Sequence, residues 1–169
     1  MSRDAALAAL DSAKASFVAA ISAVPGEALA FRKPEDDYSL GGLIAHNVGV
    51  VQHYRIVLGA LVASSGSEVR PEDPAGFWDT VAERSKAPLA AAGCAAALAE
   101  LDAEHTAFMA ELGALHGEAW DAKRPVFYGT AEEPLDTGAE DIAGWVGAHY
   151  EEHVPHVHEL EEAWRAGSA

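Results

Sequence analysis

The sequence predicts an all-α protein: a four-helix bundle with long connectors between its second and third helices and between its third and fourth. Two observations carry this prediction. Alanine is very abundant, leucine and glutamate are frequent, and β-branched runs are scarce, which favours helix. Apolar residues also recur at helical spacing in four long segments that are separated by proline- and glycine-containing stretches. The 169 residues are expected to form one domain over 1–169.

The first two helices are predicted from their end signals. The first covers residues 2–24 and ends at a Pro-Gly turn. The second covers 39–63, with Ser39 as its N-cap directly after an acidic stretch that suits the helix dipole. Serine and glycine at 64–67 are expected to form the loop that follows.

The remaining segments alternate between helix and connector. A short helix is predicted at 77–86 and the third long helix at 89–115. The second connector, 117–137, carries three aromatic residues and is expected to be packed, either as a lid over a pocket or as a cap on the bundle. The fourth helix covers 139–166, with a bend or local loosening just after His153 because Pro155 lacks a backbone N–H and clashes with the preceding turn.

Charge and cysteine content narrow the class of protein. The chain has 27 acidic against 11 basic residues, a formal net charge of -16, so it repels phosphate backbones and anionic membranes. We expect no nucleic-acid partner, and no membrane partner because no apolar run reaches the length of a membrane span. The single cysteine, Cys94, excludes an internal disulfide and fits a cytoplasmic location.

Histidines lie inside the apolar stripes of two predicted helices. His46 and His53 share one face of the second helix, and His149, His153 and His156 share one face of the fourth. Buried imidazoles cost desolvation energy unless each finds a partner, and a divalent cation is a partner that several can share. The i,i+4 spacing of His149 and His153 suits chelation. We therefore predict a metal site formed by His46, His149 and His153, with His156 as the rival ligand.

Several other residues are expected near this site. His53 lies about 10 Å along the helix from His46, too far to share its ion, and is expected to line the pocket. His105 is expected in the core or in the pocket lining, and Tyr150 either lines the pocket or packs the bundle. Glu152 adjoins both ligands and is the candidate general base. The alternative for Glu152 is a carboxylate that is solvated or that orients a ligand.

Two segments resemble the DinB superfamily of metal-binding four-helix bundles. Residues 37–46 read DYSLGGLIAH, and this family typically has an aromatic residue, a serine and an apolar run before a ligand histidine. Residues 147–153 read GAHYEEH, which is similar to the His-x3-His of the family's fourth helix. Tyr38 stands where the family usually has tryptophan, and Asn47 and the His-rich tail also depart from the pattern.

The resemblance implies a zinc or nickel ion that is held by three histidines and keeps positions open for water or substrate. Several relatives transfer groups with a low-molecular-weight thiol such as bacillithiol, mycothiol or glutathione. Our leading hypothesis is therefore a metal-dependent thiol-S-transferase-like enzyme with a small-molecule substrate. The alternatives are a hydrolase that uses metal-bound hydroxide and a binding or interaction module without catalysis. Relatives often dimerise, so a homodimer is expected.

Overall fold

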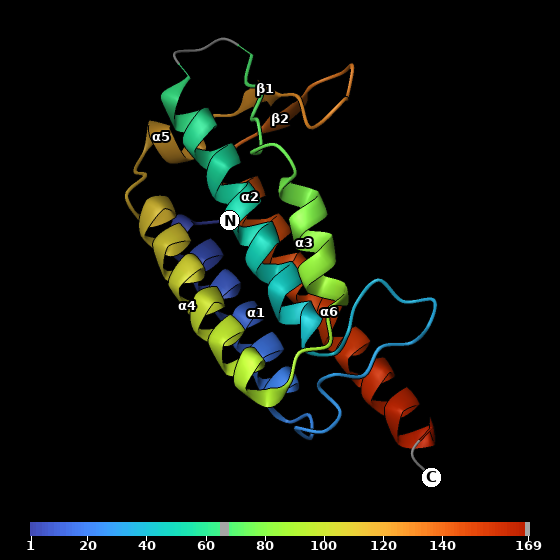
Figure 1. Cartoon of the computed structure of the whole chain (residues 1–169). Coiled ribbons are helices and arrows are strands. Elements are labelled where there is room, and N and C mark those ends of the chain that lie inside the picture. Colours follow the sequence, from blue (N-terminus) through green and yellow to red (C-terminus); the bar gives the residue numbers. More distant parts are fainter. Residues whose placement is uncertain (65–67, 168–169) are drawn as a thin grey trace.

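A computed structural model describes residues 1–64 and 68–167, and four long helices form its frame (Figure 1). These are α1 (Arg3–Ser22), α2 (Gly42–Ala63), α4 (Ala91–Gly113) and α6 (Ala139–Gly167). Two shorter helices, α3 (Phe77–Lys86) and α5 (Glu118–Asp121), lie in the connectors. The predicted four-helix bundle and the short helix at 77–86 are confirmed. Of the predicted loop at 64–67, residues 65–67 lie outside the described residues.

The long helices run in two parallel pairs. The amino terminus of Met1 lies 2.7 Å from Glu140 at the start of α6, while Arg3 contacts Gly113 at the end of α4. Helix α1 is therefore parallel to α6 and antiparallel to α4. Helix α2 packs against both α4 and α6 and runs in the direction of α4 (Figure 1). This arrangement places the antiparallel helices α2 and α6 side by side.

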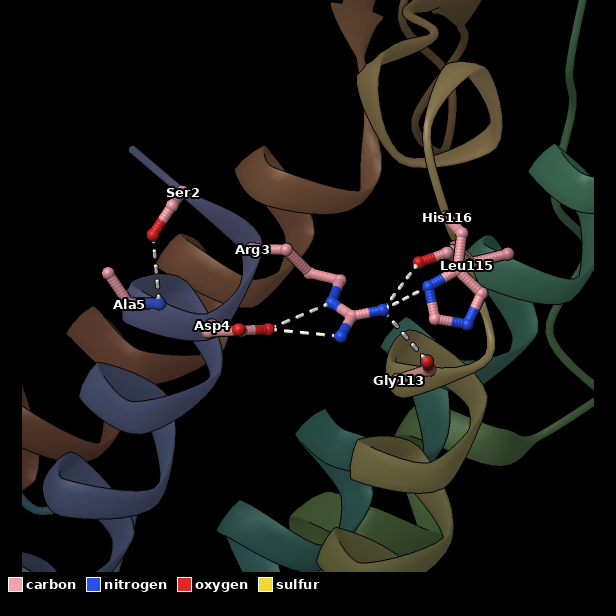
Figure 2. Close-up of polar contacts among 7 residues, drawn as sticks. All are labelled: Ser2, Arg3, Asp4, Ala5, Gly113, Leu115 and His116. Atoms are coloured by element: carbon pink, nitrogen blue, oxygen red, sulfur yellow. Dashed lines mark hydrogen bonds and ion pairs between the residues drawn. The ribbon is translucent and has the colours of Figure 1, made fainter.

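Arg3 ties the start of α1 to the end of α4 (Figure 2). Its guanidinium donates hydrogen bonds of 3.3 Å to the carbonyl oxygens of Gly113 and Leu115, and it also contacts the His116 ring. The carbonyls at a helix C-terminus have no partner within the helix, and a cation there also suits the helix dipole. Ser2 caps α1 by accepting a hydrogen bond from the Ala5 amide. Together, Ser2 and Arg3 fix the start of α1 at this end of the bundle.

The second connector contains strands that the sequence analysis did not predict. β1 (Arg124–Val126) and β2 (Leu135–Thr137) form an antiparallel pair, and Val69 of the first connector bridges to Val126. Three-residue strands show too little alternation to be recognised, and only their tertiary partners define them. Trp120 of α5 is also buried, and α5 packs against α6. The connector therefore caps the end of the bundle where α6 begins, as one of the two predicted alternatives proposed.

Two further expectations concern α6 and α1. Helix α6 continues through Pro155, so the predicted bend or local loosening after His153 does not end the helix. Helix α1 is long and apolar enough to cross a membrane by length and mean hydropathy, which the sequence analysis did not expect of any segment. Its buried face nevertheless packs on α6, where the Phe17 and Tyr150 ring centroids lie 6.0 Å apart. A core helix of a bundle has the same properties.

Ser39 joins the start of α2 to the end of α3. Its hydroxyl accepts a 2.9 Å hydrogen bond from the Gly42 amide, as an N-cap does, although α2 begins three residues after it. The same hydroxyl donates to the Ala87 carbonyl over 2.7 Å, and the Ser39 amide donates to the Ser85 carbonyl over 2.9 Å. A Cβ atom at Gly42 would lie only 1.8 Å from that Ser85 oxygen. Glycine is thus required for α3 to approach α2.

Replacing Gly42 by alanine tests this close approach. The added methyl group would collide with backbone that cannot rotate away, so we expect Gly42→Ala to lower the free energy of unfolding by about 3 kcal/mol. Gly59→Ala is the matched control on the same helix, because nothing lies within 4 Å of its added Cβ atom. That substitution should raise stability by up to about 1 kcal/mol. Urea unfolding measures both, and equal effects would contradict the proposed contact.

His105 is buried between α4, α1 and α6. Its Nδ1 lies 3.3 Å from the Tyr150 hydroxyl, and its Nε2 lies 3.5 Å from a carboxylate oxygen of Asp11. Burial lowers the pKa of His105, and nearby Lys14 lowers it further, whereas Asp11 and Asp102 raise it. Burial is the largest of these effects, so the imidazole is held in its neutral form.

This lowered pKa makes the stability of the fold depend on pH. Below about pH 6.5 the unfolded chain binds a proton at His105 that the folded chain does not, so the free energy of unfolding falls as the pH drops. His105→Phe should remove the contribution of His105 to this pH dependence, which is at most about 1.4 kcal/mol of unfolding free energy per pH unit. Urea unfolding of metal-free protein at about pH 7.5 and about pH 5.5 measures it. His158→Phe, at an exposed position, is the control, and an unchanged pH dependence in His105→Phe would contradict the assignment.

Candidate metal site

Three histidine rings converge between α2 and α6. His46 lies in the first turns of α2, and His149 and His153 lie one turn apart on the facing side of α6. The Nε2 atom of His149 is 2.9 Å from that of His46 and 3.1 Å from that of His153. One nitrogen from each ring lies within 4.8 Å of the other two. The antiparallel packing of the two helices therefore brings together the three residues that the sequence analysis selected as ligands.

Hydrogen bonding among the rings does not by itself explain this geometry. A neutral imidazole nitrogen carries either one N–H or one lone pair. The Nε2 atom of His149 faces two other Nε2 atoms, so it has a single proton or a single lone pair for two contacts. A cation among the three nitrogens would satisfy all three lone pairs at once, and imidazole is a common ligand for divalent zinc and nickel. The donor set therefore fits a divalent metal ion.

The electrostatics keep these rings available as ligands. Burial lowers the pKa of His46 to about 4 and that of His153 to about 3, and repulsion from the neighbouring imidazoles adds to both shifts. Burial also lowers the pKa of His149, although Glu152 opposes that shift. All three rings are therefore neutral near pH 7, the state in which imidazole binds a metal.

In this trio of histidines (His46, His149 and His153), the Nδ1 atoms of His149 and His153 have different surroundings. His149 Nδ1 lies 3.9 Å from a carboxylate oxygen of Glu152, whose side chain is 76% exposed. At this distance the carboxylate makes no hydrogen bond with the ring, and it lies largely in solvent. His153 Nδ1 is buried and has no hydrogen-bond partner among the described residues. Tyr38 packs over the trio, with its ring centroid 4.7 Å from that of His46 and 5.6 Å from that of His153.

His156, the predicted rival ligand, contacts Asp36 instead of the other three histidine nitrogens. Its ring stacks on that of His153, with centroids 5.7 Å apart, but its Nε2 lies 3.1 Å from a carboxylate oxygen of Asp36. Asp36 comes from the connector between α1 and α2, and it draws the ring away from the converging nitrogens. The structure therefore groups His46, His149 and His153 without His156.

Two of the three predicted pocket residues lie in the core instead. Tyr150 and His105 are both buried, and they contact each other and α1. Tyr150 follows His149 by one residue, a rotation of about 100° that turns its side chain away from the trio. Both residues therefore pack in the core, which is one of the two interpretations that the sequence left open for each. His53 is partly exposed, and its Nδ1 contacts Asp73.

A cavity of about 270 Å³ opens beside His46. Helix α3 supplies most of its wall, and the segment before α2 together with His46 of α2 supplies the rest. The lining residues are Asp37, Tyr38, His46, Trp78, Val81, Ala82, Ser85 and Lys86. The sequence analysis missed the α3 residues and Asp36. The acidic run at 35–37 beside the recognised segment was a usable signal for Asp36, whereas nothing local marked Trp78.

Fold and site together define a four-helix bundle protein with three histidines converging between two of its helices. The sequence profile of the DinB superfamily matches residues 2–157, and the chain belongs to that superfamily. No protein in a search of curated proteins matches significantly. Among solved structures, YfiT from Bacillus subtilis matches with a TM-score of 0.69 and 18% identity, over 97% of this chain and 90% of YfiT. YfiT is described as a probable metal-dependent hydrolase with an unusual four-helix bundle topology.

Removing each histidine in turn tests the metal site. We expect His46→Ala, His149→Ala and His153→Ala each to weaken Zn²⁺ or Ni²⁺ binding by more than about 100-fold, because each deletes a direct ligand. Elemental analysis after dialysis against the metal, with titration calorimetry, measures the loss. His156→Ala and the exposed His158→Ala are the controls and should retain one ion per chain. Stoichiometric metal in all three ligand variants would contradict this ligand set.

Proposed function

We propose that this protein is a metal-dependent hydrolase whose divalent ion is held by His46, His149 and His153. The observation that carries the proposal is the convergence of three neutral Nε2 atoms, two pairs of which are 2.9 and 3.1 Å apart. Three histidine ligands with an open coordination position are typical of catalytic zinc sites, whereas structural zinc sites use four protein ligands. The description of YfiT as a probable metal-dependent hydrolase supports the same class.

A divalent ion at this site would act as a Lewis acid and would make water nucleophilic near neutral pH. The protein's own residues supply the surroundings. The cavity beside His46 gives a small molecule access to one side of the trio. Tyr38 covers His46 and His153 and restricts solvent there, while Glu152 faces the outer nitrogen of His149.

Thiol transfer was the leading hypothesis from the sequence, and we rank it second here. Hydrolysis needs only water and one substrate, and the small cavity beside the trio accommodates one small molecule. Both reactions begin from the same Lewis-acidic centre. They differ in whether turnover requires a thiol. A role without catalysis is the third alternative, and it predicts no metal-dependent turnover with any substrate.

Hydrolysis of an activated ester tests the proposal. We expect Zn²⁺- or Ni²⁺-loaded protein to hydrolyse p-nitrophenyl acetate and to lose at least about 100-fold in kcat/KM on chelation or in His153→Ala, because removing the ion removes the nucleophile. The exposed variant His158→Ala should keep full activity. Parallel assays with glutathione, bacillithiol or mycothiol and a generic electrophile test the second candidate. Turnover that occurs only with a thiol would replace the hydrolase proposal with the transferase.

A further inference from the structure

A second polar cluster, around His53, lies on the same face of α2, about two helical turns from His46. The Nδ1 atom of His53 lies 2.9 and 3.0 Å from the two carboxylate oxygens of Asp73. The same carboxylate accepts a 2.8 Å hydrogen bond from the indole N–H of Trp78. These residues come from α2, the first connector and α3, so three separate segments meet to hold one imidazole.

Asp73 fixes the state of the His53 ring. A carboxylate accepts hydrogen bonds, so it holds the proton of a neutral imidazole on Nδ1 and leaves the lone pair on Nε2. The His53 and Asp73 side chains are only 18% and 19% exposed, which limits competition from water. Within the described part of the chain, His53 Nε2 makes no hydrogen bond.

Trp78 connects this cluster with the cavity beside the trio. Its ring centroid is 5.2 Å from that of His53, and the same side chain lines the cavity together with Tyr38 and His46. His53 follows His46 by seven residues, so the two rings lie on one face of α2 at about 10 Å along its axis. A molecule bound at the trio that extends past Trp78 therefore runs toward His53.

We propose that the His53–Asp73 pair is a second binding point of the site, at which His53 Nε2 accepts a hydrogen bond from a hydroxyl or amino group of the substrate. The proposal rests on the proposed metal site, and it defines the substrate class. The substrate has a metal-binding or scissile group at one end, an apolar stretch of about 10 Å against Trp78, and a hydrogen-bond donor at the other end.

Hydroxamic acids test this proposal because they chelate zinc without requiring turnover. The probes are acetohydroxamic acid, hexanohydroxamic acid and 6-hydroxyhexanohydroxamic acid, and titration calorimetry on Zn²⁺-loaded protein measures each Kd. We expect the terminal hydroxyl to tighten binding about fivefold over the plain six-carbon chain. In His53→Phe this preference should vanish, while acetohydroxamic acid binds as in the wild type. His158→Phe is the control and should keep the preference.

Two further measurements keep the outcome decisive. If His53→Phe does not fold, His53→Asn replaces it, because its amide can reach Asp73 but has nothing at the position of Nε2. Imidazole ¹⁵N spectra of the metal-free protein at alkaline pH should show the His53 proton on Nδ1. A preference that survives in the variant, or a proton found on Nε2, overturns the proposal. If acetohydroxamic acid does not bind the loaded wild type, the proposed metal site fails, and the position of the His53 proton alone decides the role of His53.

Discussion

Three imidazole rings share the interface between α2 and α6, and the rest of the site depends on the cost of burying them. Taken out of water, each ring loses hydration, and its pKa falls because the charged form is disfavoured. The rings then present neutral lone pairs to one another at about 3 Å, an arrangement that a divalent cation resolves. The surrounding packing keeps these rings together in their neutral form.

The close packing of α3 on α2 gives the site its shape. Gly42 permits backbone contact with Ser85, and Ser39 joins the two helices through hydrogen bonds. This contact brings one side of α3 next to His46 and forms the cavity wall. Two long helices thus supply the three converging histidines, and a short helix in a connector supplies most of the adjacent cavity wall.

Carboxylates from the connectors separate the histidines into groups with different roles. Asp36 binds His156 and Asp73 binds His53, while the trio has no carboxylate within hydrogen-bonding distance among the described residues. Each carboxylate contacts one nitrogen of an imidazole and so fixes the orientation of that ring, whereas a metal ligand needs a nitrogen with a free lone pair. Two acidic residues of this chain therefore hold histidine rings outside the metal site, in addition to contributing to the net charge of -16.

The sequence by itself determined the features that depend on spacing within one helix. Apolar periodicity located the four long helices, and the i,i+4 spacing paired His149 with His153. The position of Ser39 before an apolar run marked the approach to α2, where its hydroxyl accepts from the Gly42 amide although Gly41 is the N-cap. Only the tertiary structure decided which element each histidine faces. Asp36, Asp73 and the short β-strands come from connectors whose path no local pattern encodes. The reason is physical: bonds within a helix fix the angle between neighbouring side chains, but only packing between segments decides which side chains meet.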